Sequence, residues 1–135
     1  MKAEELKVGD LLTFKDCVGD SGFPILKVNG ILPDTLFVQI DYSDADDEVD
    51  YEDIIGITLT PEILEKNGFV KSKVYEVWKI ICDDYELRVT PWRVAVIFLD
   101  EDGSDKEEFS APRPKYVHEL QHALRLCGIE KEIVI

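Results

Sequence analysis

The chain has 135 residues, 45% of them hydrophobic, which is enough to bury a core in one domain or in two very small ones. Asp and Glu number 29 against 15 Lys and Arg, so the formal net charge is −14. This charge argues against direct binding to a nucleic-acid backbone or an anionic membrane, because both need clustered basic residues.

The opening MKAEELKVGD lacks the apolar run of a secretory signal, and no stretch approaches the ~20 apolar residues that cross a bilayer. Cys17, Cys82 and Cys127 are scattered and lack CxxC spacing, which is typical of reduced thiols. We therefore expect a cytoplasmic protein with no membrane contact. The sequence contains no signal for a particular oligomeric state.

Residues 1–59 contain short runs of apolar and branched residues that are typical of β-strands. The runs alternate with turn dipeptides, Asn29-Gly30 and Pro33-Asp34 among them. Several short strands joined by tight turns favour a small SH3-like β-barrel, or a curled sheet, as the first domain. Barrels of this kind often bind peptides or nucleic acid, but a fold analogy alone does not assign a ligand.

Residues 41–53, DYSDADDEVDYED, form the most acidic segment. Its carboxylates alternate from Asp44 to Asp50, as in a calcium-binding loop. An EF-hand loop that began at Asp44 would need glycine at its sixth position and glutamate at its twelfth, where the chain has Val49 and Ile55. We interpret the segment as a solvated, mobile loop whose like charges repel.

A short helix is predicted to link the two halves of the chain. Thr60 suits its N-cap, Pro61 suits its first position, and Asn67-Gly68 suits its end. The second domain, residues 60–135, begins with this helix.

The hydrophobic period then changes to two, which predicts an antiparallel meander with strands over 74–81, 85–90, 93–99 and 107–110. Four aromatic residues of this sheet are interpreted as core residues or cross-strand pairs, which is the commoner arrangement for aromatics on strands: Tyr75, Trp78, Tyr85 and Trp92.

The clearest helix is predicted over 114–127, with Pro114 in its first turn and Gly128 as its cap. Its apolar residues recur at helical spacing and predict a stripe that packs on the sheet: Tyr116, Val117, Leu120, Ala123, Leu124 and Cys127. Its polar residues are predicted to face water: His118, Gln121, His122 and Arg125. The fold class is therefore α+β, with a barrel, a linking helix, and a meander packed by a closing helix.

This helix also contains the zinc-peptidase pattern HExxH at 118–122. His118 and His122, one turn apart, could bind one Zn²⁺, and Glu119 could act as the base on its bound water. Such a site needs a third protein ligand, but the chain has only two histidines and ends soon after the helix. We favour two exposed histidines on a structural helix, with no catalytic, metal or cofactor site. Zinc on His118 and His122 stays the alternative.

Three segments carry a resemblance to a known family: the opening MKAEELKVGD, the stretch IIGITLTPEILEKNGF, and KYVHELQHALRLCGIE near the end. They resemble a family of small uncharacterised proteins from phages and mobile elements of gut Bacteroidetes. The resemblance implies an SH3-like first part, a linking helix and a meander with a closing helix. It also implies that Glu119 and His122 vary, with glutamine or asparagine at these positions in relatives.

Three functions therefore remain open. The first and favoured one is a non-enzymatic phage or mobile-element accessory protein that binds an unidentified protein partner. The second is a zinc-dependent hydrolase that uses Glu119. The third is an acidic decoy that imitates the phosphates of DNA, motivated by the net charge and by residues 41–53.

Overall fold

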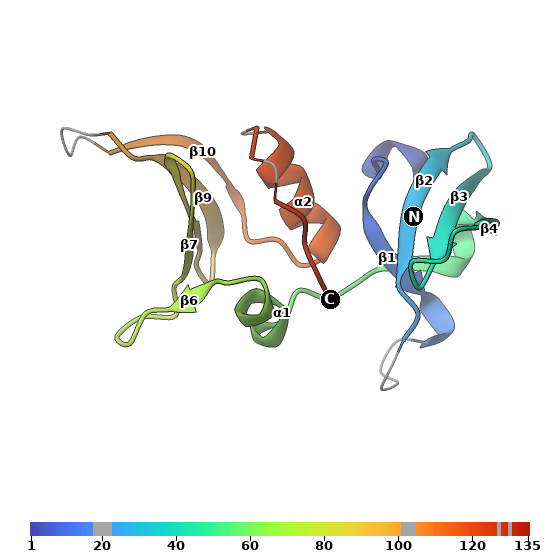
Figure 1. Ribbon diagram of the computed structural model, residues 1–135, viewed down its shortest axis with the longest axis horizontal. Coiled ribbons are helices and arrows are strands. Elements are labelled where there is room, and N and C mark those ends of the chain that lie inside the picture. Colours follow the sequence, from blue (N-terminus) through green and yellow to red (C-terminus); the bar gives the residue numbers. More distant parts are fainter. Residues whose placement is uncertain (18–22, 101–104, 127, 130) are drawn as a thin grey trace. The chain divides into compact units, whose positions relative to one another are not determined.

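The computed structural model describes residues 1–17, 23–100, 105–126, 128–129 and 131–135, and Figure 1 shows its ribbon. The chain divides into two compact units. Unit 1 comprises Met1–Thr58 and Tyr116–His118, and unit 2 comprises Leu59–Lys115 and Glu119–Ile135. Both units consist mainly of antiparallel strands with few helices, so the predicted α+β class is confirmed.

Unit 1 contains one five-stranded sheet. Its strands are β1 (Leu11–Phe14), β2 (Leu26–Ile31), β3 (Thr35–Ile40), β4 (Asp46–Asp50) and β5 (Ile54–Gly56), in the order β4-β3-β2-β1-β5. Every pairing is antiparallel. Among the described residues, β4 and β5 remain the two edges, so the strands do not close into the predicted barrel.

The core of unit 1 follows from the alternation of its strands. Residues two apart on β2 and β3 point to the same face, and four residues on that face are fully buried. The 3-10 turn Ala3–Glu5 leads into a residue that joins the same core. The buried set is Leu6, Leu12, Leu26, Val28, Leu36, Val38 and Ile54.

Two predictions for unit 1 were wrong. Asn29 and Gly30 do not form a turn but lie inside β2, where the register with β3 shifts between Val28 and Gly30. The acidic segment is not a mobile loop at its centre, because Asp46–Asp50 forms edge strand β4. Hydrogen bonds from Asn29 Nδ2 to Asp46 Oδ1 and from Thr35 Oγ1 to Glu48 Oε1, both 2.8 Å, give these carboxylates neutral partners.

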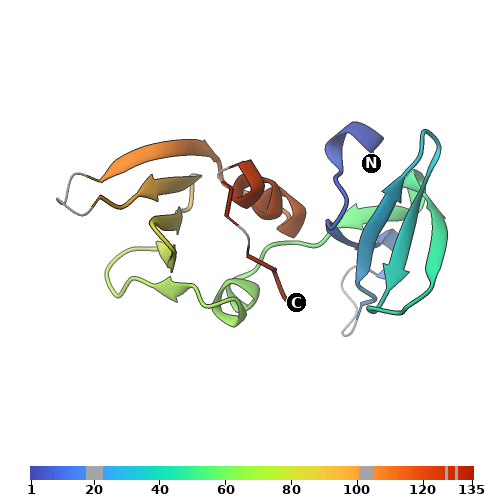
Figure 2. The same cartoon turned by 45° about the horizontal axis from the view of Figure 1, so that its top comes forward.

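Unit 2 contains the predicted meander. Its strands are β6 (Val70–Lys71), β7 (Trp78–Cys82), β8 (Tyr85–Val89), β9 (Arg93–Phe98) and β10 (Lys106–Pro112), in the order β10-β9-β8-β7-β6. Four residues on one face of β8 and β9 are buried: Leu87, Val89, Val94 and Val96. Helix α2 (Val117–Leu126) lies along the hollow side of this curved sheet (Figures 1 and 2).

Helix α2 begins three residues later than predicted. Pro114 is not in its first turn, because the segment ahead of the helix is extended: Tyr116 forms a β-bridge with Thr58, and Val117 N donates to Ile57 O at 2.8 Å. The predicted stripe is confirmed, since Val117, Leu120, Ala123 and Leu124 are buried and Tyr116 is half-buried. Gly128 provides the expected cap at φ 71°. Cys127 and the predicted helix end at 127 lie outside the described residues.

Linking helix α1 (Pro61–Lys66) has the predicted ends. Thr60 Oγ1 accepts a hydrogen bond from Ile63 N at 3.3 Å, Pro61 occupies the first position, and Asn67 forms the C-cap. Asn67 also ties a distant segment to this helix. Its buried Nδ2 donates to Ile63 O at 2.8 Å and to Val134 O at 2.7 Å, while its Oδ1 accepts from Val134 N at 2.7 Å.

We predict that Asn67→Ala lowers the free energy of unfolding by about 2–3 kcal/mol, because partly buried backbone groups of Ile63 and Val134 lose three hydrogen bonds. Chemical denaturation followed by tryptophan fluorescence measures the loss. Asn29→Ala removes an exposed asparagine and serves as the matched control, with an expected cost below about 1 kcal/mol. Equal losses for the two variants would contradict this role of Asn67.

Candidate functional site

The HExxH residues occupy three different environments. His118 is only 5% exposed, His122 is half-buried and Glu119 is exposed. The prediction that both histidines face water is therefore wrong for His118, and it is also wrong for Gln121, which is buried. Among the described residues, no group of three or more His, Cys, Asp or Glu side chains could hold a metal ion.

The burial of His118 has a packing cause. Its ring stacks on Tyr116, with centroids 5.6 Å apart and planes 11° apart. Both rings lie against Gly56 in β5, where an added Cβ would come within 2.6 Å of Tyr116 Cγ and 2.7 Å of His118 Cε1. The first residues of α2 therefore pack on β5 at a position that only glycine fits. The His118 ring has a structural role in this contact.

We predict that Gly56→Ala destabilises the protein by about 1–3 kcal/mol, the range typical of overpacking. Gly30→Ala is the matched control in the same sheet, because its Cβ would meet Phe37 at an ordinary 3.4 Å. We expect the control to change the free energy of unfolding by less than about 0.5 kcal/mol. Thermal denaturation followed by circular dichroism measures both. A tolerated Gly56→Ala would show that the Tyr116 and His118 rings do not pack there.

A second region, in unit 2, exposes large apolar side chains. Trp92 is 82% exposed and Tyr75 is 70% exposed, so the prediction that these aromatics belong to the core or to cross-strand pairs was wrong. The same prediction is confirmed for Tyr85, which pairs with Phe98 across β8 and β9 with ring centroids 5.6 Å apart.

Trp92 lies in a tightly bonded turn between β8 and β9. Thr90 Oγ1 accepts from Trp92 N at 3.3 Å and from Arg93 N at 3.0 Å, and it donates to Arg93 O at 3.1 Å. Arg113, which follows the end of β10, donates two hydrogen bonds to this turn. Its N donates to Trp92 O at 3.0 Å, and its Nη1 donates to Thr90 O at 3.1 Å. The tryptophan is therefore presented to solvent on a backbone that is fixed on both sides.

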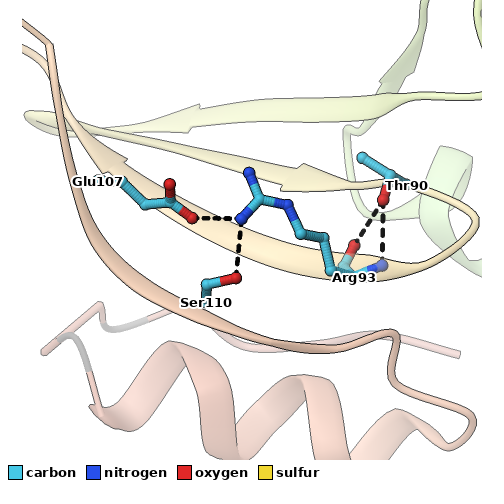
Figure 3. A network of polar contacts seen from close by, with 4 residues as sticks. All are labelled: Thr90, Arg93, Glu107 and Ser110. Carbon is cyan, nitrogen blue, oxygen red and sulfur yellow. Dashed lines mark hydrogen bonds and ion pairs between the residues drawn. The ribbon is translucent and has the colours of Figure 1, made fainter.

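Arg93, next to Trp92, is also fixed. Its Nη1 donates to Glu107 Oε1 at 2.6 Å and to Ser110 Oγ at 2.9 Å (Figure 3). Both partners come from β10, so the guanidinium bridges two neighbouring strands. A bonded guanidinium loses little further rotational freedom when a ligand binds beside it.

The turn forms one wall of a hollow of about 480 Å³, within the range of small-ligand pockets. The connection between β6 and β7 also lines the hollow, and it is held by a hydrogen bond from Ser72 N to Val77 O at 2.9 Å. The hollow is lined by Val74, Tyr75, Glu76, Val77, Thr90, Pro91, Trp92 and Arg93. We call this hollow the aromatic groove.

A smaller hollow of about 260 Å³ continues from the aromatic groove over the outer face of the sheet. The two hollows share Tyr75, Val77, Thr90 and Arg93. The smaller one is also lined by three residues that the strand register places in one row: Lys79 on β7, Arg88 on β8 and Ala95 on β9. We call it the basic hollow.

The sequence held one signal that could have revealed this site. Pro91 and Trp92 fall between two predicted strands, and a tryptophan in a turn cannot reach the core as easily as one inside a strand. The contribution of residues 74–77 could not be seen, because they were predicted to belong to the strand 74–81, whereas β7 begins at Trp78.

Comparisons with protein families, with curated proteins and with solved structures found no match to this chain. Among the described residues, no helix has the length and apolar character that crossing a membrane requires. The geometry of the aromatic groove is therefore the basis for assigning a function.

Proposed function

We propose that this chain is a non-enzymatic protein-interaction module of a phage or mobile element, and that the aromatic groove receives an extended segment of a partner protein. The observation that carries the proposal is Trp92, which is 82% exposed on a turn held by hydrogen bonds that Thr90 Oγ1 accepts and Arg113 donates. Solvent-exposed tryptophan costs solubility and adds nothing to a core, whereas tryptophan is enriched at the centres of protein interfaces.

The shape and composition of the aromatic groove support a peptide ligand. Two aromatic side chains, Trp92 and Tyr75, line the groove from two different connections, and Pro91, Val74 and Val77 complete an apolar lining. Aromatic residues supply large contact areas at a small cost in side-chain entropy. Extended peptides, proline-rich ones included, dock in aromatic-lined grooves of this type.

The test is to select a randomised peptide library, displayed on phage, for binding to the full chain. We predict that the selection yields an enriched pool of peptides whose binding requires Trp92. Trp92→Ala should weaken that pool about thirtyfold or more, the effect of losing about 2 kcal/mol at an interface hot spot. Fluorescence anisotropy with peptides from the pool measures the change.

Ile81→Ala is the matched control, because Ile81 is 65% exposed on the same sheet but does not line the aromatic groove. Both substitutions should leave the free energy of unfolding within about 0.5 kcal/mol of the original chain, since both side chains face solvent. A pool that binds the original chain and Trp92→Ala equally, or no enriched pool at all, would refute the proposed function.

Two other functions remain as proposals from the sequence, a zinc-dependent hydrolase and an acidic decoy. A zinc-dependent hydrolase would use His118 and His122 as ligands and Glu119 as base. This function predicts about one zinc per chain in protein purified without a tag, and loss of that zinc in His122→Ala.

The SH3-like character of residues 1–59 likewise stays a prediction, and the peptide-binding proposal does not depend on it.

The acidic decoy has one specific observation in its favour. Strand β4 is exposed on four of its five residues, all of them carboxylates, and three of these, Asp46, Glu48 and Asp50, share one face and form a row of like charges. A decoy should bind a basic DNA-binding protein in a salt-sensitive manner, with affinity lost when Asp46, Glu48 and Asp50 become amides. Unchanged affinity in that triple variant would eliminate it.

A further inference from the structure

We infer that the segment received by the aromatic groove is acidic, with a carboxylate side chain next to its apolar anchor. This inference rests on the proposed function and specifies the chemistry of the partner. Its starting point is the basic hollow, which opens directly from the aromatic groove and shares Arg93 with it.

The basic hollow concentrates positive charge on a chain whose net charge is −14. Lys79, Arg88 and Arg93 line it, and none of its described lining residues is a carboxylate. Two carboxylates at its border, Glu86 and Glu107, each pair with one of the arginines. In the described part of the chain Lys79 has no such partner, so the hollow retains an excess of positive charge.

Both arginines keep donors for a ligand. Arg88 contacts Glu86 through Nε at 2.8 Å and Nη2 at 2.7 Å, whereas the two side-chain contacts of Arg93 use only Nη1. A guanidinium carries five N–H donors, so Arg93 retains those on Nε and Nη2, the pair that receives a carboxylate in bidentate fashion. The existing pairs also keep both arginines in place before a ligand arrives.

The floor of the basic hollow leaves room for that carboxylate. Ala95 lies opposite Arg88 in the register of β8 and β9, at the end of the row, and has the shortest side chain of the three. A larger residue at this position would fill the space above the sheet. The combination of a small floor, a lysine and two oriented arginines is suited to a compact anion such as a carboxylate.

An acidic peptide agrees with these charges better than a nucleic acid does. A polyanion would approach with many phosphates and would be repelled by the net charge of −14 over a distance of about 10 Å at moderate salt. A short peptide brings one or two carboxylates and places them on Lys79 and Arg93. Its apolar side chain then occupies the aromatic groove between Trp92 and Tyr75.

The composition of the peptide pool selected on the full chain tests this inference. We expect Asp and Glu to be enriched beside an aromatic or aliphatic residue. For a fluorescein-labelled peptide from the pool, replacing its acidic residues by the corresponding amides should weaken binding about three- to tenfold at low salt, and this difference should disappear at high salt.

Lys79→Glu should abolish the preference for the acidic peptide over its amide form, while Trp92→Ala weakens both peptides. Lys66→Glu is the matched control, because it makes the same change in net charge on α1, away from the basic hollow. The preference should survive in Lys66→Glu.

Each result has a separate meaning. A Trp92-dependent pool without acidic enrichment, or a preference that survives Lys79→Glu, overturns the acidic partner and leaves the proposed function standing. A pool that does not depend on Trp92 overturns both. Oligothymidylate that binds more tightly than the acidic peptide, and loses affinity in Lys79→Glu, assigns the groove to single-stranded nucleic acid and overturns the inference.

Discussion

The hydroxyl of Thr90 bonds to three backbone groups of the turn between β8 and β9, and the exposed surface of unit 2 depends on that arrangement. The hydroxyl adds to the backbone hydrogen bond from Thr90 N to Arg93 O at 2.9 Å and to the hydrogen bonds from Arg113. Together these contacts fix the backbone from which the aromatic and the basic side chain extend. Such pre-organisation lowers the entropy that a bound partner must offset.

The parts of the fold that the sequence predicted are those controlled by local chemistry. The cap of α1 needs only Thr60, Pro61 and Asn67, and each of these acts on its own neighbours. The stripe of α2 and the meander of unit 2 follow from periodicity, which the burial of a single face enforces. None of these features requires knowledge of a distant contact.

The parts that the sequence did not predict depend on distant partners. Helix α2 begins late because Tyr116 pairs with Thr58, and His118 is buried because Gly56 leaves space for its ring. In the same way, the acidic run joins the sheet because β3 offers an unpaired edge, and backbone pairing with that edge overrides the repulsion expected among its carboxylates. Local composition contains no information about any of these three contacts.

The two charged regions show why net charge is a poor guide to a binding surface. Four carboxylates in β4 and three basic residues at the basic hollow occupy different units, and only the first is visible as a run in the sequence. Lys79, Arg88 and Arg93 are distributed over three strands, and the antiparallel register is what gathers them. The register places Lys79 opposite Arg88, and it places Arg93 two residues along β9 from Ala95, the partner of Arg88. A chain of net charge −14 can therefore carry a compact cationic site, and the long-range repulsion from the rest of its surface restricts that site to ligands with few negative charges.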